Sequence, residues 1–336
     1  MTAPGHLMAA EVAEIPDVIE GQLRANLEAY LALGRAWAKE PPAFFATCAR
    51  GTSDQAALFF KYLTEIGSGI PVASLGPSLG SLFPVSLRMK GAALLAISQS
   101  GASPDLVALT RKAAEGGADT FALLNTVASP LGAAAGRVLP LSAGPERAVA
   151  ATKSFVASLV AVAAIHAGQT GDRDLEADLL ALPGHLRAGA RELDLRPLAG
   201  TRRLFCLGRG LGLAIAGEAA LKFKETCLLA AEGASSAEFR HGPLALADRD
   251  TAALVFLQDD ATRPGTEALA ATLKDRGATV MVLGAGSDCL PRDLRHPATQ
   301  AIGAITVFYR AVQQLALSLG LDPDVPPHLQ KATLTE

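Results

Sequence analysis

The stretch Leu94–Asp105 constrains the possible folds more than any other part of this sequence. It begins with four apolar residues, which is typical of a buried strand, and continues as Ser98-Gln99-Ser100-Gly101. Ser103 and Pro104 then precede apolar residues at helical spacing, which predicts a helix with Ser103 as N-cap and Pro104 at its first position. The free N–H groups and dipole of such a helix start can bind phosphate, although an ordinary serine-rich turn is the alternative. Neither G-x-G-x-x-G nor G-K-[ST] follows the strand, which argues against a dinucleotide fingerprint or a Walker loop.

Strands and helices alternate on both sides of this stretch. We expect strands at residues 44–49, 72–74, 120–125 and 138–141, and helices at residues 16–39, 54–64, 149–167 and 173–192, with residues 1–16 forming an arm. This alternation predicts an α/β fold in which a mainly parallel sheet lies between layers of helices, a flavodoxin-like three-layer sandwich.

The second half of the chain repeats this plan. Arg203–Gly210 matches the strand end at residues 48–51, and Ala253–Leu257 matches the stretch at residues 93–97 at an offset of 160. The loops differ, because Ser98-Gln99-Ser100-Gly101 becomes Gln258-Asp259-Asp260-Ala261. Two carboxylates would repel a phosphate, so we expect one working phosphate loop per chain, in the first half.

Composition excludes several classes of protein. The net charge of −3 over 336 residues gives no basis for binding nucleic acid or an acidic membrane. The longest apolar run, residues 155–165, is too short to span a bilayer, and the N-terminus lacks the pattern of a signal peptide. The four cysteines contain no C-x-x-C pair, which predicts buried free thiols in a cytoplasmic protein rather than disulfides or a metal site: Cys48, Cys206, Cys227 and Cys289. We expect no metal and no organic cofactor.

Three groups of ionisable residues are candidates for chemistry. Glu218, Lys222 and Glu225 follow each other at spacings of four and three, which places them on one helix face. A surface ion-pair ladder is the ordinary interpretation of that spacing, but small apolar neighbours predict a buried helix, where ionisable groups are candidates for function. His241 before Gly-Pro and Lys331 near the end of the chain would, taken alone, be structural or solvated residues.

Taken together, the motifs resemble the sugar isomerase (SIS) family, most closely the isomerase half of glucosamine-6-phosphate synthase. The resemblance covers nearly the whole chain, and the motifs occur in the same order: Ser98–Gly101, Ala143–Glu146 with Val149–Lys153, Glu218–Glu225, Glu238–Ala245 and Lys331. Ala151 stands where the synthase pattern has serine and Ser103 where it has threonine. The chain begins directly at the isomerase-like half, without the synthase's glutaminase domain. We therefore expect that glutamine is not its ammonia source and that it resembles stand-alone class II glucosamine-6-phosphate deaminases.

The resemblance implies a role for each matching residue. Glu225 would be the general base for proton transfer between C1 and C2, and Lys222 would stabilise the enediol-like intermediate. His241 would open the sugar ring, reaching in from the partner subunit of a homodimer, and Lys331 would form a Schiff base with the open-chain ketose. Phosphate and sugar hydroxyls would be bound by the remaining residues of the set: Thr52, Ser53, Ser98, Gln99, Ser100, Ser103, Val149, Ala150, Ala151 and Gln330.

The implied domain organisation has four parts. These are an N-terminal arm and helix (1–40), a phosphate-binding SIS subdomain (41–193), a catalytic SIS subdomain (194–322) and a C-terminal tail (323–336) with Lys331. The implied function is conversion of glucosamine 6-phosphate and water to fructose 6-phosphate and ammonia. A galactosamine-6-phosphate deaminase, a fructosamine-phosphate deglycase and a non-catalytic sugar-phosphate sensor remain alternatives.

Overall fold

Two parallel β-sheets organise the computed structural model, which describes residues 3–331. The chain divides into two compact units. The first-sheet unit comprises residues 18–146 and 153–176, and the second-sheet unit comprises residues 3–17, 147–152 and 177–331.

The first sheet has five strands in the order β2-β1-β3-β4-β5, and every pair of neighbours is parallel. The order reverses at β1, where Cys48 lies opposite Ala96 of β3. Most of its strand residues are buried, as expected for a sheet covered on both faces. The strands are β1 (Phe45–Cys48), β2 (Val72–Ser74), β3 (Ala93–Ser98), β4 (Asp119–Leu124) and β5 (Arg137–Pro140).

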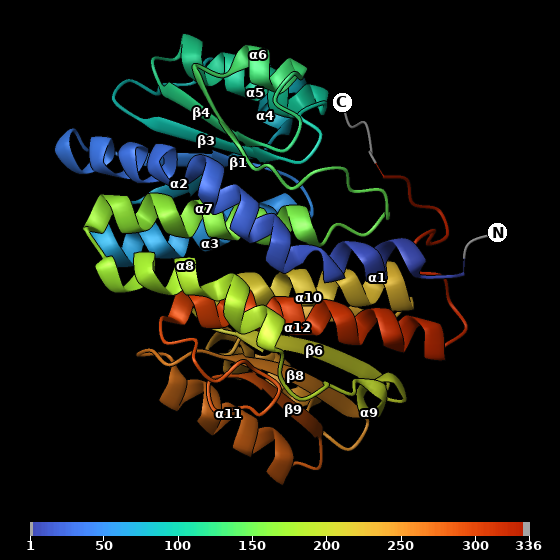
Figure 1. The fold of residues 1–336 in the computed structure, drawn as a ribbon. Helices are drawn as coiled ribbons and strands as arrows, with labels where there is room; N and C mark the ends of the chain where they lie inside the picture. The colour runs from blue at the N-terminus through green and yellow to red at the C-terminus, as the bar shows by residue number, and fades with distance from the viewer. Residues whose placement is uncertain (1–2, 332–336) are drawn as a thin grey trace. The chain divides into compact units, whose positions relative to one another are not determined.

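Helices cover both faces of the first sheet (Figure 1). On one face, α5 (Pro104–Glu115) packs on β1, β3 and β4, beside α4 (Ser78–Ser81) and α6 (Pro130–Ala134). On the other face, α3 (Thr52–Ser68) contacts α7 (Lys153–Thr170), whose side chains are buried all round. Helix α2 (Ile15–Lys39) packs backbone to backbone on α7, because a Cβ at Gly34 would lie 2.0 Å from the carbonyl oxygen of Ile165.

The second sheet has four parallel strands in the order β7-β6-β8-β9. Helix α11 (Arg263–Asp275) packs on β8 and β9, and α10 (Leu211–Cys227) and α12 (Pro297–Ser318) contact each other and this sheet (Figure 1). The strands are β6 (Arg203–Gly208), β7 (Ala231–Ser235), β8 (Thr251–Leu257) and β9 (Thr279–Gly284). The remaining elements are α1 (His6–Ala13), α8 (Arg173–Ala188), α9 (Arg196–Ala199), η1 (Glu238–His241) and η2 (Pro243–Leu246).

The predicted α/β class, with two parallel sheets between helices, is confirmed. The duplication extends to single residues. Gly51 precedes α3 with φ 54° and ψ −129°, and Gly210 precedes α10 with φ 57° and ψ −127°. Strand β5 has no counterpart among the described strands of the second sheet. The two halves therefore share one α/β plan of different sheet width.

Three predictions about local structure are wrong, and the smallest error is the helix expected at residues 173–192, which ends at Ala188. The arm at residues 1–16 contains the helix α1, whose first N–H groups bond to the Asp324 carboxylate (Leu7 N, 2.8 Å; Met8 N, 2.7 Å). The helix expected from residue 149 begins at Lys153. There the Glu146 carboxylate accepts the Ser154 N–H at 3.0 Å and its hydroxyl at 2.6 Å, which caps the helix at that point. Residues 149–152 consequently form an irregular loop.

All four cysteines are free, as predicted, but their burial differs. Cys48, Cys206 and Cys227 are buried, and burial raises the pKa of Cys48 to about 12 and that of Cys227 to about 11. Cys289 is only half-buried, so the prediction that every thiol is buried is wrong for this one. It lies in the loop after β9, where its thiol faces the Glu192 carbonyl at 3.7 Å.

Candidate active site

The loop between β3 and α5 carries several serine hydroxyl groups, and two of them are fixed by hydrogen bonds from backbone N–H groups of the loop. Ser98 Oγ accepts the N–H of Gly101 at 3.0 Å, and Ser100 Oγ accepts the N–H of Ala102 at 3.3 Å. Since each oxygen acts as an acceptor toward the loop, its own O–H hydrogen is left to donate to a ligand. Ser98 is buried, while Gln99 and Ser100 are half-buried. We call residues 98–103 the cradle.

Two further observations suit the cradle to an anion. Gly101 has φ 63°, and a Cβ there would lie 2.1 Å from Ser129 Oγ, so only glycine allows this turn. Ser103 occupies the N-cap of α5 and Pro104 its first turn, as predicted. In the described chain the Ser103 hydroxyl makes no capping bond, contrary to the usual role of an N-cap serine. The start of α5 therefore keeps both its dipole and a free hydroxyl.

Thr52 and Ser53 lie at the same edge of the first sheet as the cradle. Both belong to the first turn of α3 and are half-buried. Strand β1 leads into them, and it neighbours β3 at the point where the strand order reverses. In open α/β sheets, ligands bind outside the carboxyl ends of the strands at such a reversal. The first-sheet unit thus brings Thr52, Ser53 and the cradle to the edge where a ligand is expected.

In the second-sheet unit, residues 147–151 are held as an irregular loop by α1 and by the start of the tail. The Glu11 carboxylate of α1 accepts the N–H groups of Arg147 and Ala148. The carbonyl of Asp324 accepts the N–H of Val149 at 3.3 Å. Val149 and Ala151 are half-buried and Ala150 is buried. The predicted sugar-binding residues therefore lie on a positioned loop rather than in a helix.

The candidate trio Glu218, Lys222 and Glu225, of which the last two are predicted to be catalytic, lies inside the second-sheet unit on one face of α10. Lys222 and Glu218 are completely buried, whereas the Glu225 side chain is 21% exposed. Lys222 Nζ contacts Glu225 Oε2 and lies 3.5 Å from Glu218 Oε1, which also accepts the Tyr309 hydroxyl of α12 at 2.8 Å. The surface-ladder interpretation is thereby excluded. Tyr309 is not predictable as a partner of this trio from the sequence, because no neighbouring residue marks it.

The electrostatics of this trio are decided by its two carboxylates. Burial lowers the pKa of Lys222, but Glu218 and Glu225 together outweigh this effect and hold the pKa above its ordinary value. Lys222 is therefore a buried ammonium at neutral pH, flanked by two carboxylates. Glu225 is the more accessible carboxylate, which is the arrangement that a base facing a substrate requires.

His241 and Lys331 lie at the surface of the second-sheet unit. His241 ends the short helix η1 and is exposed, and Phe239 of the same turn anchors it by packing on Phe205, with ring centroids 4.8 Å apart. Gln330 is exposed and Lys331 is half-buried in the tail. The rest of the predicted tail, residues 332–336, lies outside the described residues.

In the second half, the loop matching the cradle is filled by its own carboxylates. Asp260 Oδ1 accepts the N–H of Thr262 at 2.7 Å and the Thr262 hydroxyl, and Asp259 pairs with Arg263 at 3.0 Å. A polar cavity of about 440 Å³ lies beside this loop, lined by Asp259, Arg263, Arg295 and Gln300 among others. None of the predicted site residues lines it.

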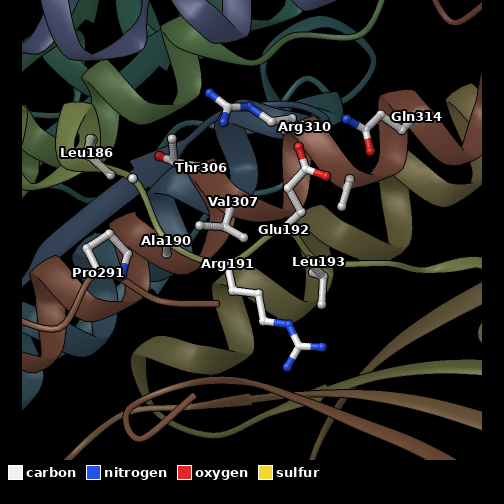
Figure 2. A pocket seen from close by; sticks show the side chains of 12 residues that line it. Leu186, Ala190, Arg191, Glu192, Leu193, Pro291, Thr306, Val307, Arg310 and Gln314 are labelled. Carbon is white, nitrogen blue, oxygen red and sulfur yellow. The ribbon is translucent and has the colours of Figure 1, made fainter. Parts of the chain in front are cut away.

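A second, much smaller cavity of about 60 Å³ lies between residues 189–193 and α12 (Figure 2). Glu192, Thr306, Arg310 and Gln314 surround it, and none of them is a predicted site residue. Among residues 3–331, no group of His, Cys, Asp and Glu side chains is arranged to hold a metal ion. No helix of the described chain is long and apolar enough to cross a membrane.

Comparison with known proteins finds one family model, the SIS domain, which matches residues 45–167 and 198–288. A curated relative, the isomerizing glutamine–fructose-6-phosphate aminotransferase of Methanothermobacter thermautotrophicus, is 31% identical over 98% of this chain and 58% of its own length. The enzyme of the same name from Halobacterium salinarum is 37% identical over 71% of this chain and 41% of its own length. The chain thus spans about half the length of the curated relatives it matches.

Solved structures agree on the fold. A protein from Silicibacter pomeroyi DSS-3, provisionally named as a phosphosugar isomerase, is 39% identical with a TM-score of 0.88, covering 96% of this chain and all of that one. The glucosamine-6-phosphate deaminase of Thermotoga maritima has a TM-score of 0.80 at 20% identity, covering 98% of this chain and 99% of that one. At that identity the second likeness concerns the fold alone.

Proposed function

Because this chain belongs to the SIS domain family, we propose that it is an amino-sugar phosphate deaminase of the aldose–ketose isomerase type. The proposed reaction converts glucosamine 6-phosphate and water to fructose 6-phosphate and ammonia. The observation that carries the proposal is the buried Glu218–Lys222–Glu225 trio on α10. A protein that only binds sugar phosphates needs no buried ammonium between two carboxylates, since burying such charges carries a desolvation cost and buried ionisable clusters are typical of active sites.

The proposed substrate contacts follow from the two units taken separately. The cradle would bind the 6-phosphate through the hydroxyls of Ser98, Ser100 and Ser103, the Gln99 amide and the N-terminus of α5. Thr52, Ser53, Gln330 and the backbone of residues 149–151 would bind sugar hydroxyls. Ala151 offers no side-chain hydroxyl, which leaves the choice of sugar epimer to the other contacts.

The proposed chemistry begins with ring opening. His241, whose exposed position fits a group that serves a partner subunit in a homodimer, moves the proton between the ring oxygen and O1. Glu225 then removes the C2 proton and delivers it to C1, while O1 gains a proton and the C2 nitrogen loses one, which turns the aldehyde and C2 amine into a C1 alcohol and a C2 imine. The Lys222 ammonium stabilises the negative charge that develops on O1.

Hydrolysis completes the reaction. Water adds to the C2 imine, the C–N bond breaks and ammonia leaves, which yields the ketone of fructose 6-phosphate. Lys331 would take part by adding its amine to the C2 imine ahead of water, so that ammonia leaves and the resulting Schiff base with the open-chain ketose is hydrolysed to the ketone and the free lysine. We write the reaction as a deamination because this direction needs only water as co-substrate.

The test is ammonia release by the purified protein. Glucosamine 6-phosphate, galactosamine 6-phosphate and fructosamine 6-phosphate are offered in parallel, and fructose 6-phosphate is assayed as a product. Ammonia and fructose 6-phosphate from the first sugar support the proposal. Preference for another sugar keeps the chemistry and replaces the substrate, whereas binding without any turnover contradicts the enzyme and favours a sugar-phosphate sensor.

A further inference from the structure

Arg50 lies at the carboxyl end of β1, directly before Gly51 and the start of α3. Its guanidinium group donates through Nε and Nη2 to one carboxylate oxygen of Asp105, in the first turn of α5. The other oxygen of Asp105 accepts the N–H of Leu106 at 2.8 Å. The Asp105 side chain is completely buried, but the Arg50 side chain is 41% exposed. One end of the guanidinium is therefore fixed, while the rest remains accessible.

The ion pair changes the charge of the cradle. The buried Asp105 carboxylate in the first turn of α5 would reduce the positive potential of the helix N-terminus, and would therefore weaken binding of a phosphate there. The Arg50 guanidinium neutralises that negative charge. It also acts electrostatically on the first turn of α3. There, partial burial raises the pKa of Asp54, and the nearby Arg50 guanidinium works against this rise. With Nε and part of Nη2 engaged by Asp105, the Nη1 amino group and one N–H of Nη2 are left to donate.

The second half of the chain contains a matched arginine without this arrangement. Arg209 precedes Gly210 as Arg50 precedes Gly51, and the two glycines share one backbone conformation. At the offset of 160, Asp105 corresponds to Gly265, and a Cβ at Gly265 would lie 3.7 Å from Arg209 Nη1. Arg209 thus reaches the first turn of α11, but it makes no ion pair with any residue between 3 and 331. Within the described residues, the combination of a fixed arginine and a hydroxyl loop therefore occurs in the first half and not in the second.

We propose that Arg50 binds the substrate phosphate, as a guanidinium fixed on Asp105 whose remaining N–H groups complete the cradle. The inference rests on the proposed function in one respect, namely that the ligand of the cradle is a sugar phosphate. Guanidinium suits this role because it can donate to a carboxylate and to a phosphate at the same time.

The experiment measures binding by calorimetry with two probes that cannot be deaminated, inorganic phosphate and glucitol 6-phosphate. Arg50→Gln alone is ambiguous, because it leaves Asp105 buried without a cation. The double variant Arg50→Gln/Asp105→Asn removes both charges and keeps an amide pair in their place. We expect this double variant to bind both probes about 10- to 100-fold more weakly than the wild type, because a charge-assisted hydrogen bond is lost.

Two further variants complete the test. Arg50→Lys preserves the cation that Asp105 needs but not the forked geometry, and we expect it to bind about 5-fold or more weakly. If thermal unfolding shows that the double variant does not fold, the affinity of Arg50→Lys alone decides the test. Arg209→Gln is the matched control and should leave both affinities unchanged. Wild-type affinity in both the double variant and Arg50→Lys would overturn the inference, as would a wild-type protein that binds neither probe.

These outcomes separate the inference from the proposed function. If the wild type releases ammonia but its phosphate affinity does not depend on Arg50, the inference fails and the function stands. If both probes bind in an Arg50-dependent way and no amino sugar is turned over, the function fails and the inference stands.

Discussion

Glu225 is the residue on which the proposed chemistry depends most directly. Replacing it with glutamine removes the base but preserves size and hydrogen bonding, so ammonia release should fall by about 100-fold or more. Binding of glucitol 6-phosphate should be retained, because the cradle belongs to other residues. Lys224→Gln is the control, since Lys224 is exposed on the same helix. A Glu225→Gln variant with near-normal turnover would exclude Glu225 as the base.

The buried Lys222 ammonium should make the free energy of unfolding depend on pH. Its pKa is higher in the folded protein than the ordinary value of 10.5, so the folded state holds this proton more tightly. The stability that the ion cluster contributes is therefore complete below about pH 10.5 and is lost as the pH rises through the folded pKa. At pH 8, Lys222→Met should lower the free energy of unfolding by about 3–5 kcal/mol, because Glu218 stays buried without its cation.

Urea unfolding at several values between pH 8 and pH 11 checks this prediction. The difference between the wild type and Lys222→Met should shrink toward the alkaline end. A parallel series with the exposed Lys224→Met shows how much of any change is a general alkaline effect. A difference that stays constant over the whole range would mean that the Lys222 ammonium does not stabilise the fold.

At the scale of elements, Asp324 connects α1, the tail and the loop at residues 147–151. Its carboxylate caps α1 and its carbonyl holds Val149. Asp324→Ala should cost about 1–2 kcal/mol of stability through loss of the cap. It should also raise KM for the sugar phosphate more than it lowers kcat, because the loop loses its support while the α10 trio is untouched.

Chemical denaturation and steady-state kinetics of Asp324→Ala measure the two effects. Val325→Ala, at a 70% exposed neighbour, serves as the control and should change neither quantity. If Asp324→Ala lost stability but kept a wild-type KM, the capping role would stand and the loop-positioning role would not.

An element can be predicted from the sequence when the residues that stabilise it are its neighbours in the chain, and it is missed when they are distant. The strand, loop and helix at residues 93–115 are specified by adjacent residues, so their positions were predicted correctly. Helix α1 was missed because the group that caps it, Asp324, is more than 300 residues away. The start of α7 was misplaced because apolar residues 149–151 continue its pattern, whereas Glu146 caps the helix at Lys153. Tyr309 was missed for the same reason as α1, since its partner Glu218 lies on another helix.

At the scale of the whole molecule, the duplication gives the chain two corresponding loops, the cradle and the loop at residues 258–262. Their side chains differ in chemistry. The first has hydroxyls whose hydrogens are free to donate, and the second has carboxylates already bonded to Thr262 and Arg263. The repeat and the substitution of its loop are both visible in the sequence, but the self-capping by Asp260 is not. The two loops also differ in backbone, because Ser103 before α5 is extended (φ −65°, ψ 117°) whereas Thr262 before α11 is helical (φ −85°, ψ −16°).

Because the two loops differ in this way, we expect one phosphate-binding site per chain. Calorimetry with glucitol 6-phosphate should give one site per chain. Gln99→Asp/Ser100→Asp gives the first loop the residues found at 259 and 260, and phosphate binding should then fall below detection because two carboxylates repel the dianion. The converse change, Asp259→Gln/Asp260→Ser, is the matched control and should leave affinity and stoichiometry unaltered. Two sites in the wild type, or binding that survives the first exchange, would show that the phosphate is held elsewhere than in the cradle. One site that disappears with the first exchange alone would assign the phosphate to the first half of the chain.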